Sequence, residues 1–343
     1  MSGFRWAAWR RCGLGAVMVG LFVTFAQARV EIVFPTANQA WANNNLEAFV
    51  QATVSGDPES GLFGCVRTNG TQFHEGLDIK SLTRDRRGEA TDEIFAAMTG
   101  IVRHINLSPG GSSYGRYIVI EHPDEQPAVY TLYAHLAKVE PGVRPGVRVA
   151  RGQTIATMGR SASGSGIPKD RAHLHFEIGL RLTDQFQSWY AFRKFGSPNE
   201  QGDFNGMNLM GVDALDFLRQ WRSGRVSTFQ HYFDRMKPVV KFRVATTRVP
   251  DFIQRYPALL RKPISGLVAG WEVECNATGL PFSWTPLSAN EVIGFAPNEV
   301  RILSVDAAIE RATRCKQLVK PRRGGHGPGD DLLTMLQLVF GLR

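Results

Sequence analysis

Short apolar runs separated by Gly, Pro and Asn fill the middle of the chain from residue 61 onward. Val, Ile, Phe and Tyr are frequent in these runs, as in β-strands, and the separators are typical turn formers. The spacing predicts a mostly antiparallel β-sheet or sandwich with an open groove. The expected strands are residues 61–66, 77–80, 100–105, 117–122, 129–136, 147–157 and 173–180.

The pattern changes after residue 182, where apolar residues recur at helical spacing in several short segments. Helices are expected at 213–222, with Asp213 as the N-cap, and at 226–236 and 307–319. Strands are expected at 239–244, 266–275 and 299–305. This part therefore predicts a smaller C-terminal α+β unit. The expected division is 1–28, 29–60, 61–222, 223–320 and a tail at 321–343, with the large β domain at 61–222.

The first 28 residues have the order of a secretory signal. Arg5, Arg10 and Arg11 precede an apolar run at 13–25, and cleavage is expected after Ala28. The apolar run is short for a membrane span. We therefore expect export to the periplasm or the outside of the cell, with no stable span after cleavage; an uncleaved anchor is the alternative.

Charge and cysteine content narrow the partners and the compartment. The 343 residues carry a formal charge of +9, and removing residues 1–28 with their three arginines leaves +6. A basic exported protein suits an anionic polymer or surface, and export argues against nucleic acid. Three cysteines remain, and a disulfide is expected in an oxidising compartment. We expect Cys275 to pair with Cys315, which leaves Cys65 free, although sequence alone does not decide the pairing.

Four of the eight histidines fall in three short motifs. His74 and Asp78 are four residues apart, with Gly76 between them to allow a bend. His173 and His175 alternate with apolar residues and therefore share one face of a predicted strand, together with Glu177. His135 ends the run at 129–136. Singly these histidines read as exposed or structural residues, but together they offer the nitrogen and carboxylate ligands that zinc accepts.

The chain here resembles the lysostaphin/LytM-type zinc endopeptidases, peptidase family M23. The resemblance covers roughly residues 63–216 and includes the motifs FHEGLDI at 73–79, YTLYAHL at 130–136 and HLHFEI at 173–178. It implies a Zn²⁺ ion held by His74, Asp78 and His175, with His173 and His135 as catalytic groups. It also implies hydrolysis of peptide bonds in bacterial peptidoglycan through a zinc-activated water.

Within that resemblance we expect His173 to be the base, because its strand position holds it beside His175. Glu177 and Glu75 are candidate partners of the metal-bound histidines. The loop at 161–169, rich in Gly and Ser, is expected to border the cleft. The charged stretch at 82–93 is longer than is usual in the family and is expected to be a solvated loop.

Two alternatives stay open at this stage. Some relatives lose metal ligands and regulate other wall enzymes by binding, although every ligand type is present here. Other relatives cut glycine-rich bridges or secreted proteins.

The segment at 143–159 also resembles a biotinyl carrier, but it has no lysine to modify. The role of residues 223–343 and any regulatory protein partner cannot be read from the sequence.

Overall fold

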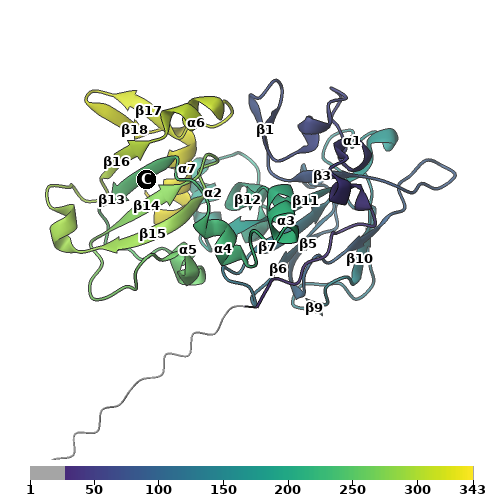
Figure 1. Ribbon diagram of the computed structural model, residues 1–343, viewed down its shortest axis with the longest axis horizontal. Helices are drawn as coiled ribbons and strands as arrows, with labels where there is room; N and C mark the ends of the chain where they lie inside the picture. Colours follow the sequence, from purple (N-terminus) through teal and green to yellow (C-terminus); the bar gives the residue numbers. More distant parts are fainter. Residues whose placement is uncertain (1–27, 343) are drawn as a thin grey trace, which may run out of the picture.

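The computed structural model describes residues 28–342, so the expected signal at 1–28 lies outside the described residues except for Ala28. Within the described part, no helix is long and apolar enough to cross a membrane. The structure is built mainly from antiparallel strands, which confirms the predicted fold class. Figure 1 shows two lobes, one with the strands up to β12 and the other with the strands from β13 onward.

The larger lobe contains a seven-stranded sheet in the order β12-β11-β7-β6-β5-β9, with β3 also paired to β11. Its strands are β3 (Leu77–Lys80), β5 (Gly100–Asn106), β6 (Tyr117–Glu121), β7 (Tyr130–Ala134), β9 (Arg148–Val149), β11 (His173–Arg181) and β12 (Leu209–Val212). A second sheet joins β4 (Glu93–Phe95), β10 (Thr154–Thr157) and β8 (Lys138–Val139). A separate hairpin joins β1 (Gly64–Arg67) to β2 (Gln72–His74). Short helix α1 (Leu46–Phe49) precedes the hairpin.

The predicted strands of this lobe are present with small shifts in their ends. The one substantial difference concerns residues 147–157, which form two strands, β9 and β10, in different sheets. The chain reverses between them at Gly152, whose φ of +78° is a conformation that glycine adopts without strain. A single continuous strand was therefore a wrong prediction, because the turn lies inside one apolar run.

The C-terminal lobe is an α+β unit with a four-stranded sheet in the order β15-β14-β13-β16. Its strands are β13 (Val240–Val244), β14 (Gly270–Cys275), β15 (Pro281–Leu287) and β16 (Val300–Val305), with a hairpin of β17 (Val319–Arg322) and β18 (Gly325–Pro328). The helices after β11 are α2 (Phe186–Arg193), α3 (Ala214–Arg222), α4 (Phe229–Asp234), α5 (Asp251–Arg255), α6 (Ala307–Ala312) and α7 (Asp330–Phe340). Asp213 caps α3 as predicted, since its side chain accepts from the amide of Asp216.

Several features of this lobe differ from the sequence expectation, among them α5 and the β17–β18 hairpin, which were not predicted. Strand β15 was missed because it contains two prolines, which a strand tolerates here because β15 lies at the edge of its sheet. The helix expected at 307–319 ends at Ala312, because the chain then turns toward Cys315 and enters β17. The described part of the tail, residues 321–342, is folded, and its helix α7 buries Leu336 and Phe340 in the core.

The two lobes share one hydrophobic core, which contains Leu180 and Phe186 from one lobe and Trp284 and Phe340 from the other. Polar contacts also cross between them. The Trp189 indole of α2 donates to Gln337 of α7 at 3.1 Å, and the backbone amide of Arg181 donates to the Tyr256 hydroxyl at 3.0 Å. Because the core continues from one lobe into the other, the domain boundary predicted at residue 222 stays a prediction.

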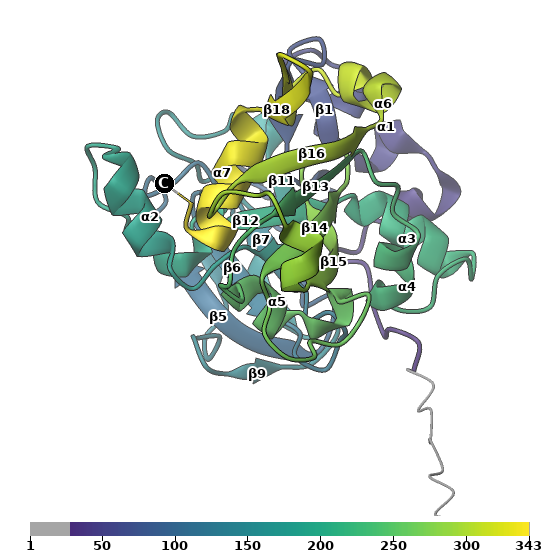
Figure 2. The ribbon, with the colours of Figure 1, turned by 90° about the vertical axis from the view of Figure 1, so that its left-hand side faces the viewer.

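A disulfide joins Cys65 of β1 to Cys315, which lies between α6 and β17, and Cys275 is a buried free thiol. The expected pairing of Cys275 with Cys315 was therefore wrong. The two were chosen because both lie in the C-terminal unit, but β1 packs at the same end of the molecule as α6 and β18 (Figure 2). Cys275 instead sits fully buried in the core of its own lobe, at the end of β14.

Replacing both bridged cysteines by serine should lower the free energy of unfolding. The bridge spans 250 residues, and the chain-entropy estimate for so long a loop is about 5 kcal/mol, an upper value because denatured chains retain structure. Urea unfolding of the double variant measures the loss. Adding dithiothreitol should destabilise the parent protein by a similar amount and leave the double variant unchanged. Equal midpoints for parent and variant would contradict the prediction.

Candidate active site

Two strands of the main sheet, β3 and β11, and strand β2 of the separate hairpin bring the predicted metal ligands together. In the register of the sheet, His175 of β11 lies opposite Asp78 of β3 and Ala134 of β7. His74 ends β2, and a two-residue bend then leads into β3. All three ligand candidates are buried, and their donor atoms lie within 4.8 Å of one another. The sequence prediction that these residues meet is therefore satisfied by the geometry.

Gly76 makes this close approach possible. A Cβ atom at residue 76 would lie 2.5 Å from the carbonyl oxygen of Phe176 and 2.9 Å from Nε2 of His175. No real side chain fits at such distances without displacing β11. The bend expected at this glycine is thus also a packing requirement, because the backbone of the His74–Asp78 segment passes directly over the ligand strand.

The hydrogen-bond partners fix which ring nitrogens face the cluster. Nδ1 of His74 lies 2.7 Å from the carbonyl oxygen of Leu62, and Nε2 of His175 lies 2.9 Å from a carboxylate oxygen of Glu177. Carbonyl and carboxylate oxygens only accept, so these nitrogens carry the protons. The opposite nitrogens, Nε2 of His74 and Nδ1 of His175, therefore present lone pairs to Asp78.

The three lone-pair donors are close enough to demand a cation. Nε2 of His74 and Nδ1 of His175 are 3.0 Å apart, and they lie 3.1 Å and 3.0 Å from Oδ1 of Asp78. Ligands of a tetrahedral zinc ion at about 2.0 Å are separated by about 3.3 Å. The donor set, its spacing and its burial therefore fit a metal ion such as zinc.

The acidic neighbours of His175 also favour positive charge. Burial would lower the pKa of His175, but its hydrogen bonds with Asp78 and Glu177 outweigh burial and raise that pKa to about 10. Burial likewise opposes ionisation of Asp78, yet the surrounding histidines hold its pKa well below the usual range. A proton and a metal cation therefore compete for this site.

Glu177 is confirmed as a partner of a ligand histidine, and it is almost completely buried. Tyr114 and Tyr130 donate to its two oxygens at 2.6 Å and 2.7 Å. Burial and the Glu177 charge raise the pKa of both tyrosines well above the usual range, so both remain donors. Glu75, the other predicted acidic partner, is exposed and lines a different pocket together with Tyr114 and Tyr117.

The two remaining histidines stand beside the cluster. The ring centroids of His135 and His173 are 4.8 Å apart, and Nε2 of His173 lies 3.5 Å from Oδ1 of Asp78. Nδ1 of His173 donates to the carbonyl of Arg171, and Nδ1 of His135 donates to the carbonyl of Ser161. Both rings therefore direct an Nε2 lone pair away from the backbone. Burial, reinforced by the neighbouring histidines, lowers the pKa of His135 well below its usual value.

His135 has a left-handed backbone conformation, with φ of +61°. A non-glycine residue in this region is strained, and such strain concentrates at functional sites. The backbone of His135 is held there because its amide donates to the carbonyl of Tyr114 at 2.9 Å. The end of β7 is therefore shaped so that the ring turns toward His173.

A groove of about 270 Å³ opens over these side chains. As predicted, the loop at 161–169 forms part of its wall, through Ala162, Gly166 and Ile167. The charged stretch at 82–93 supports that loop from behind, because Arg84 donates to the carbonyls of Lys169 and Asp170 and Glu89 pairs with Arg160. The expectation of a merely solvated loop was therefore incomplete.

Residues 72–186 match the profile of peptidase family M23. The chain carries an M23 peptidase domain. The match confirms the resemblance drawn from the motifs, and it contains every ligand candidate and both adjacent histidines. No curated protein matches the chain.

Several solved structures resemble the M23 domain. A zinc-containing peptidase from Vibrio cholerae is 26% identical over 44% of this chain and 36% of its own, with a TM-score of 0.29. The catalytic domain of the prophage-encoded M23 protein EnpA from Enterococcus faecalis is 22% identical over 38% and 79%, with a TM-score of 0.27. The catalytic domain of lysostaphin from Staphylococcus simulans is 17% identical over 54% and 98%, with a TM-score of 0.30. The match thus spans about a third of the Vibrio cholerae chain.

Sequence reasoning did not find Arg67, whose guanidinium lies 2.6 Å from Oδ2 of Asp78. It also missed Tyr114 and the backbone carbonyls that orient the histidines. Arg67 precedes the first motif, on the strand that pairs with β2, and Tyr114 lies in a loop before β6. Neither position carries a sequence signal, because their roles depend on long-range packing.

Substituting Gly76 by Ala should crowd His175 and Phe176. We expect the free energy of unfolding to fall by about 1–3 kcal/mol, together with weaker metal binding. Gly110→Ala is the matched control, because a Cβ there meets nothing within 4 Å. Thermal unfolding and a zinc titration measure both effects; a Gly76→Ala protein that behaves like the Gly110→Ala control would refute the packing argument.

Metal affinity should fall as the pH is lowered. Because the pKa of His175 is raised to about 10, the metal-free protein holds a proton there at neutral pH, and metal binding must release it. One released proton corresponds to about a tenfold weaker apparent affinity per pH unit below that pKa. Calorimetric titration with zinc in buffers of different ionisation enthalpy counts the protons. Binding without proton release between pH 7 and pH 9 would contradict the assignment.

Proposed function

We propose that the protein is an exported zinc-dependent endopeptidase that hydrolyses peptide bonds of bacterial peptidoglycan. The observation that carries the proposal is the convergence of three buried lone-pair donors beside two further histidines at an open groove. Membership of the M23 domain in a peptidase family supports the reaction class. The two imidazole nitrogens and one carboxylate oxygen of the cluster are ligand types that zinc accepts, which supports the choice of metal.

The proposed roles follow the donor geometry. His74, Asp78 and His175 would hold the metal through Nε2, Oδ1 and Nδ1. When bound there, a zinc ion supplies Lewis-acid chemistry and lowers the pKa of a water ligand. Glu177 keeps the His175 ring in the required tautomer, because its carboxylate accepts a hydrogen bond from the Nε2–H group of that ring. Tyr114 and Tyr130 hold Glu177 in turn.

His173 is the proposed general base. Its Nε2 lone pair faces the groove beside the ligand cluster, where it can accept a proton from the water that attacks the peptide carbonyl. When the carbon–nitrogen bond breaks, the same nitrogen can return that proton to the departing amine. The His135 ring stands next to His173, and burial holds its pKa well below the usual value, so the ring is neutral at rest. Once protonated, it would stabilise the developing oxyanion.

Peptidoglycan is the proposed substrate for two reasons. The mature chain is basic, which suits an anionic wall polymer. The groove is also lined by the loop at 161–169 and by the hairpin residue Arg67, and a peptide strand would bind between them. A glycine-rich bridge or a secreted protein is the alternative substrate.

The proposal predicts that the mature protein from Arg29 shortens crosslinked peptidoglycan fragments, as measured by mass spectrometry. His173→Ala should lower the rate by about 10²–10⁴-fold, because it removes the base but no proposed ligand. His326→Ala is the matched control, since His326 is exposed on β18. Zinc-stripped protein should be inactive and should recover on adding zinc.

Cleavage that persists fully in His173→Ala would contradict the assignment of the base. Binding without cleavage by zinc-loaded, folded protein would favour a catalytically silent wall-binding regulator. Cleavage of a pentaglycine peptide, with peptidoglycan stems left intact, would identify the glycine-rich alternative. The mass of the released fragments distinguishes these cases, because each bond leaves different termini.

A further inference from the structure

The β1–β2 hairpin leads to the metal centre along both of its strands. Strand β1 ends at Arg67, whose Nη2 lies 2.6 Å from Oδ2 of Asp78. Strand β2 ends at His74, whose Nε2 lies 3.1 Å from Oδ1 of the same carboxylate. The hairpin belongs to neither large sheet. Its placement therefore depends on contacts made by its side chains.

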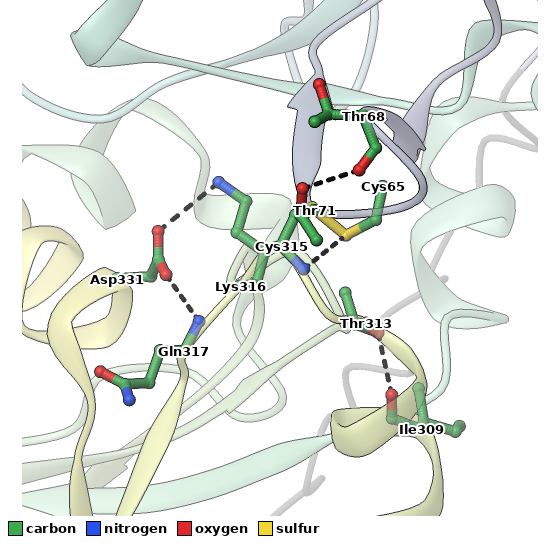
Figure 3. The surroundings of a disulfide bond; sticks show 9 residues. All are labelled: Cys65, Thr68, Thr71, Ile309, Thr313, Cys315, Lys316, Gln317 and Asp331. Atoms are coloured by element: carbon green, nitrogen blue, oxygen red, sulfur yellow. Dashed lines mark hydrogen bonds and ion pairs between the residues drawn. A yellow bond between two sulfur atoms is a disulfide. The ribbon is translucent and has the colours of Figure 1, made fainter. Parts of the chain in front are cut away.

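The C-terminal unit supplies such contacts through two consecutive residues, Cys315 and Lys316. Cys315 forms the disulfide with Cys65, and its amide lies 3.3 Å from the Cys65 sulfur (Figure 3). The ammonium of Lys316 stands 4.2 Å from the centre of the Phe73 ring, a cation–π contact. Cys65 and Phe73 are direct cross-strand partners in the hairpin. The two residues thus hold opposite strands at the same level.

The segment that carries Cys315 and Lys316 is in turn bound to α7. Asp331, near the start of that helix, accepts the amide of Gln317 at 2.6 Å and lies 3.6 Å from the ammonium of Lys316. Helix α7 is fixed in the shared core by Leu336 and Phe340. A continuous set of contacts therefore runs from the core of the C-terminal unit to the two ends of the hairpin.

The two carboxylate oxygens of Asp78 have different partners, and Arg67 determines which oxygen faces the histidines. Its guanidinium takes Oδ2, and its Nε donates to the carbonyl of Ser60 at 3.2 Å, which fixes the direction of the side chain. Oδ1 is then left to face His74, His173 and His175. Partners that orient a ligating carboxylate typically change metal affinity by 10- to 100-fold when they are removed.

We propose that Arg67 is a positioning residue for Asp78, and that the C-terminal unit, through Cys315 and Lys316, holds the hairpin from which Arg67 acts. This inference rests on the metal site of the proposed function. It gives residues 223–343 a definite task, which is to preorganise the metal centre of the M23 domain. The side chain of Arg67 is about one quarter exposed at the groove, while Asp78 is buried, so the pair is only partly screened by solvent.

The first test measures zinc affinity directly, by competition with a chromophoric chelator, in the full mature chain. Arg67→Met should weaken zinc binding by about 10- to 100-fold. Arg67→Lys, which keeps the charge but not the forked guanidinium, should recover part of the loss. Arg144→Met is the control for loss of an exposed arginine and should bind zinc like the parent. Unchanged zinc affinity in Arg67→Met would overturn the role of Arg67.

The second test asks whether the contacts of Cys315 and Lys316 with the hairpin influence zinc affinity through Arg67. The Cys65→Ser/Cys315→Ser protein and Lys316→Met should each bind zinc more weakly than the parent. Adding Arg67→Met to the cysteine double variant should cost less than it does in the parent, because the two changes disturb the same contact. Lys316→Met keeps the disulfide, so it remains informative if the double variant does not fold.

Parental zinc affinity in Lys316→Met and in a folded cysteine double variant would overturn the part assigned to the C-terminal unit. Full additivity with Arg67→Met would do the same. The absorption spectrum of bound Co²⁺ provides a second readout, since a displaced Asp78 alters the ligand geometry. None of these measurements uses peptide cleavage. The inference fails if the variants bind zinc as tightly as the parent protein. The proposed function fails if the zinc-loaded parent protein does not cleave its substrate.

Discussion

Three lone pairs that point at one another dominate the site, and a cation between them makes their arrangement favourable. The backbone carbonyl of Leu62 and the carboxylate of Glu177 fix the tautomers of His74 and His175, so neither ring can relieve the contact by turning its proton inward. Asp78 adds a negative charge at the same point. The surrounding structure holds these atoms together in a buried place where isolated charge is costly.

The rest of the molecule is arranged around that constraint. The pairing of β3 with β11 places Asp78 opposite His175, and Gly76 lets the backbone between the first two ligands pass close over β11. Tyr114 and Tyr130 retain Glu177 in the core as an acceptor. On the other side, Arg67 occupies the oxygen of Asp78 that does not face the histidines. Each ligand thus has a partner that limits its orientation.

Local signals in the sequence predicted the main strands and the meeting of His74, Asp78 and His175, while their role as metal ligands stays a proposal. Alternation of apolar residues with His173 and His175 determines the face of β11, and spacing around Gly76 determines the bend before Asp78. The disulfide, the short helix α6 and Arg67 could not be predicted in the same way. Cys65 and Cys315 are 250 residues apart, and only the packing of the two lobes brings them together. The prolines of β15 likewise mask a strand whose edge position is a tertiary property.

The central claim is that His74, Asp78 and His175 form one zinc site through Nε2, Oδ1 and Nδ1. Crystals of the mature protein grown with zinc, with diffraction data collected on both sides of the zinc absorption edge, test it most directly. The account predicts a single strong anomalous peak at about 2.0–2.2 Å from each of those three atoms. A peak at other residues, or none at this cluster in zinc-saturated crystals, would contradict it.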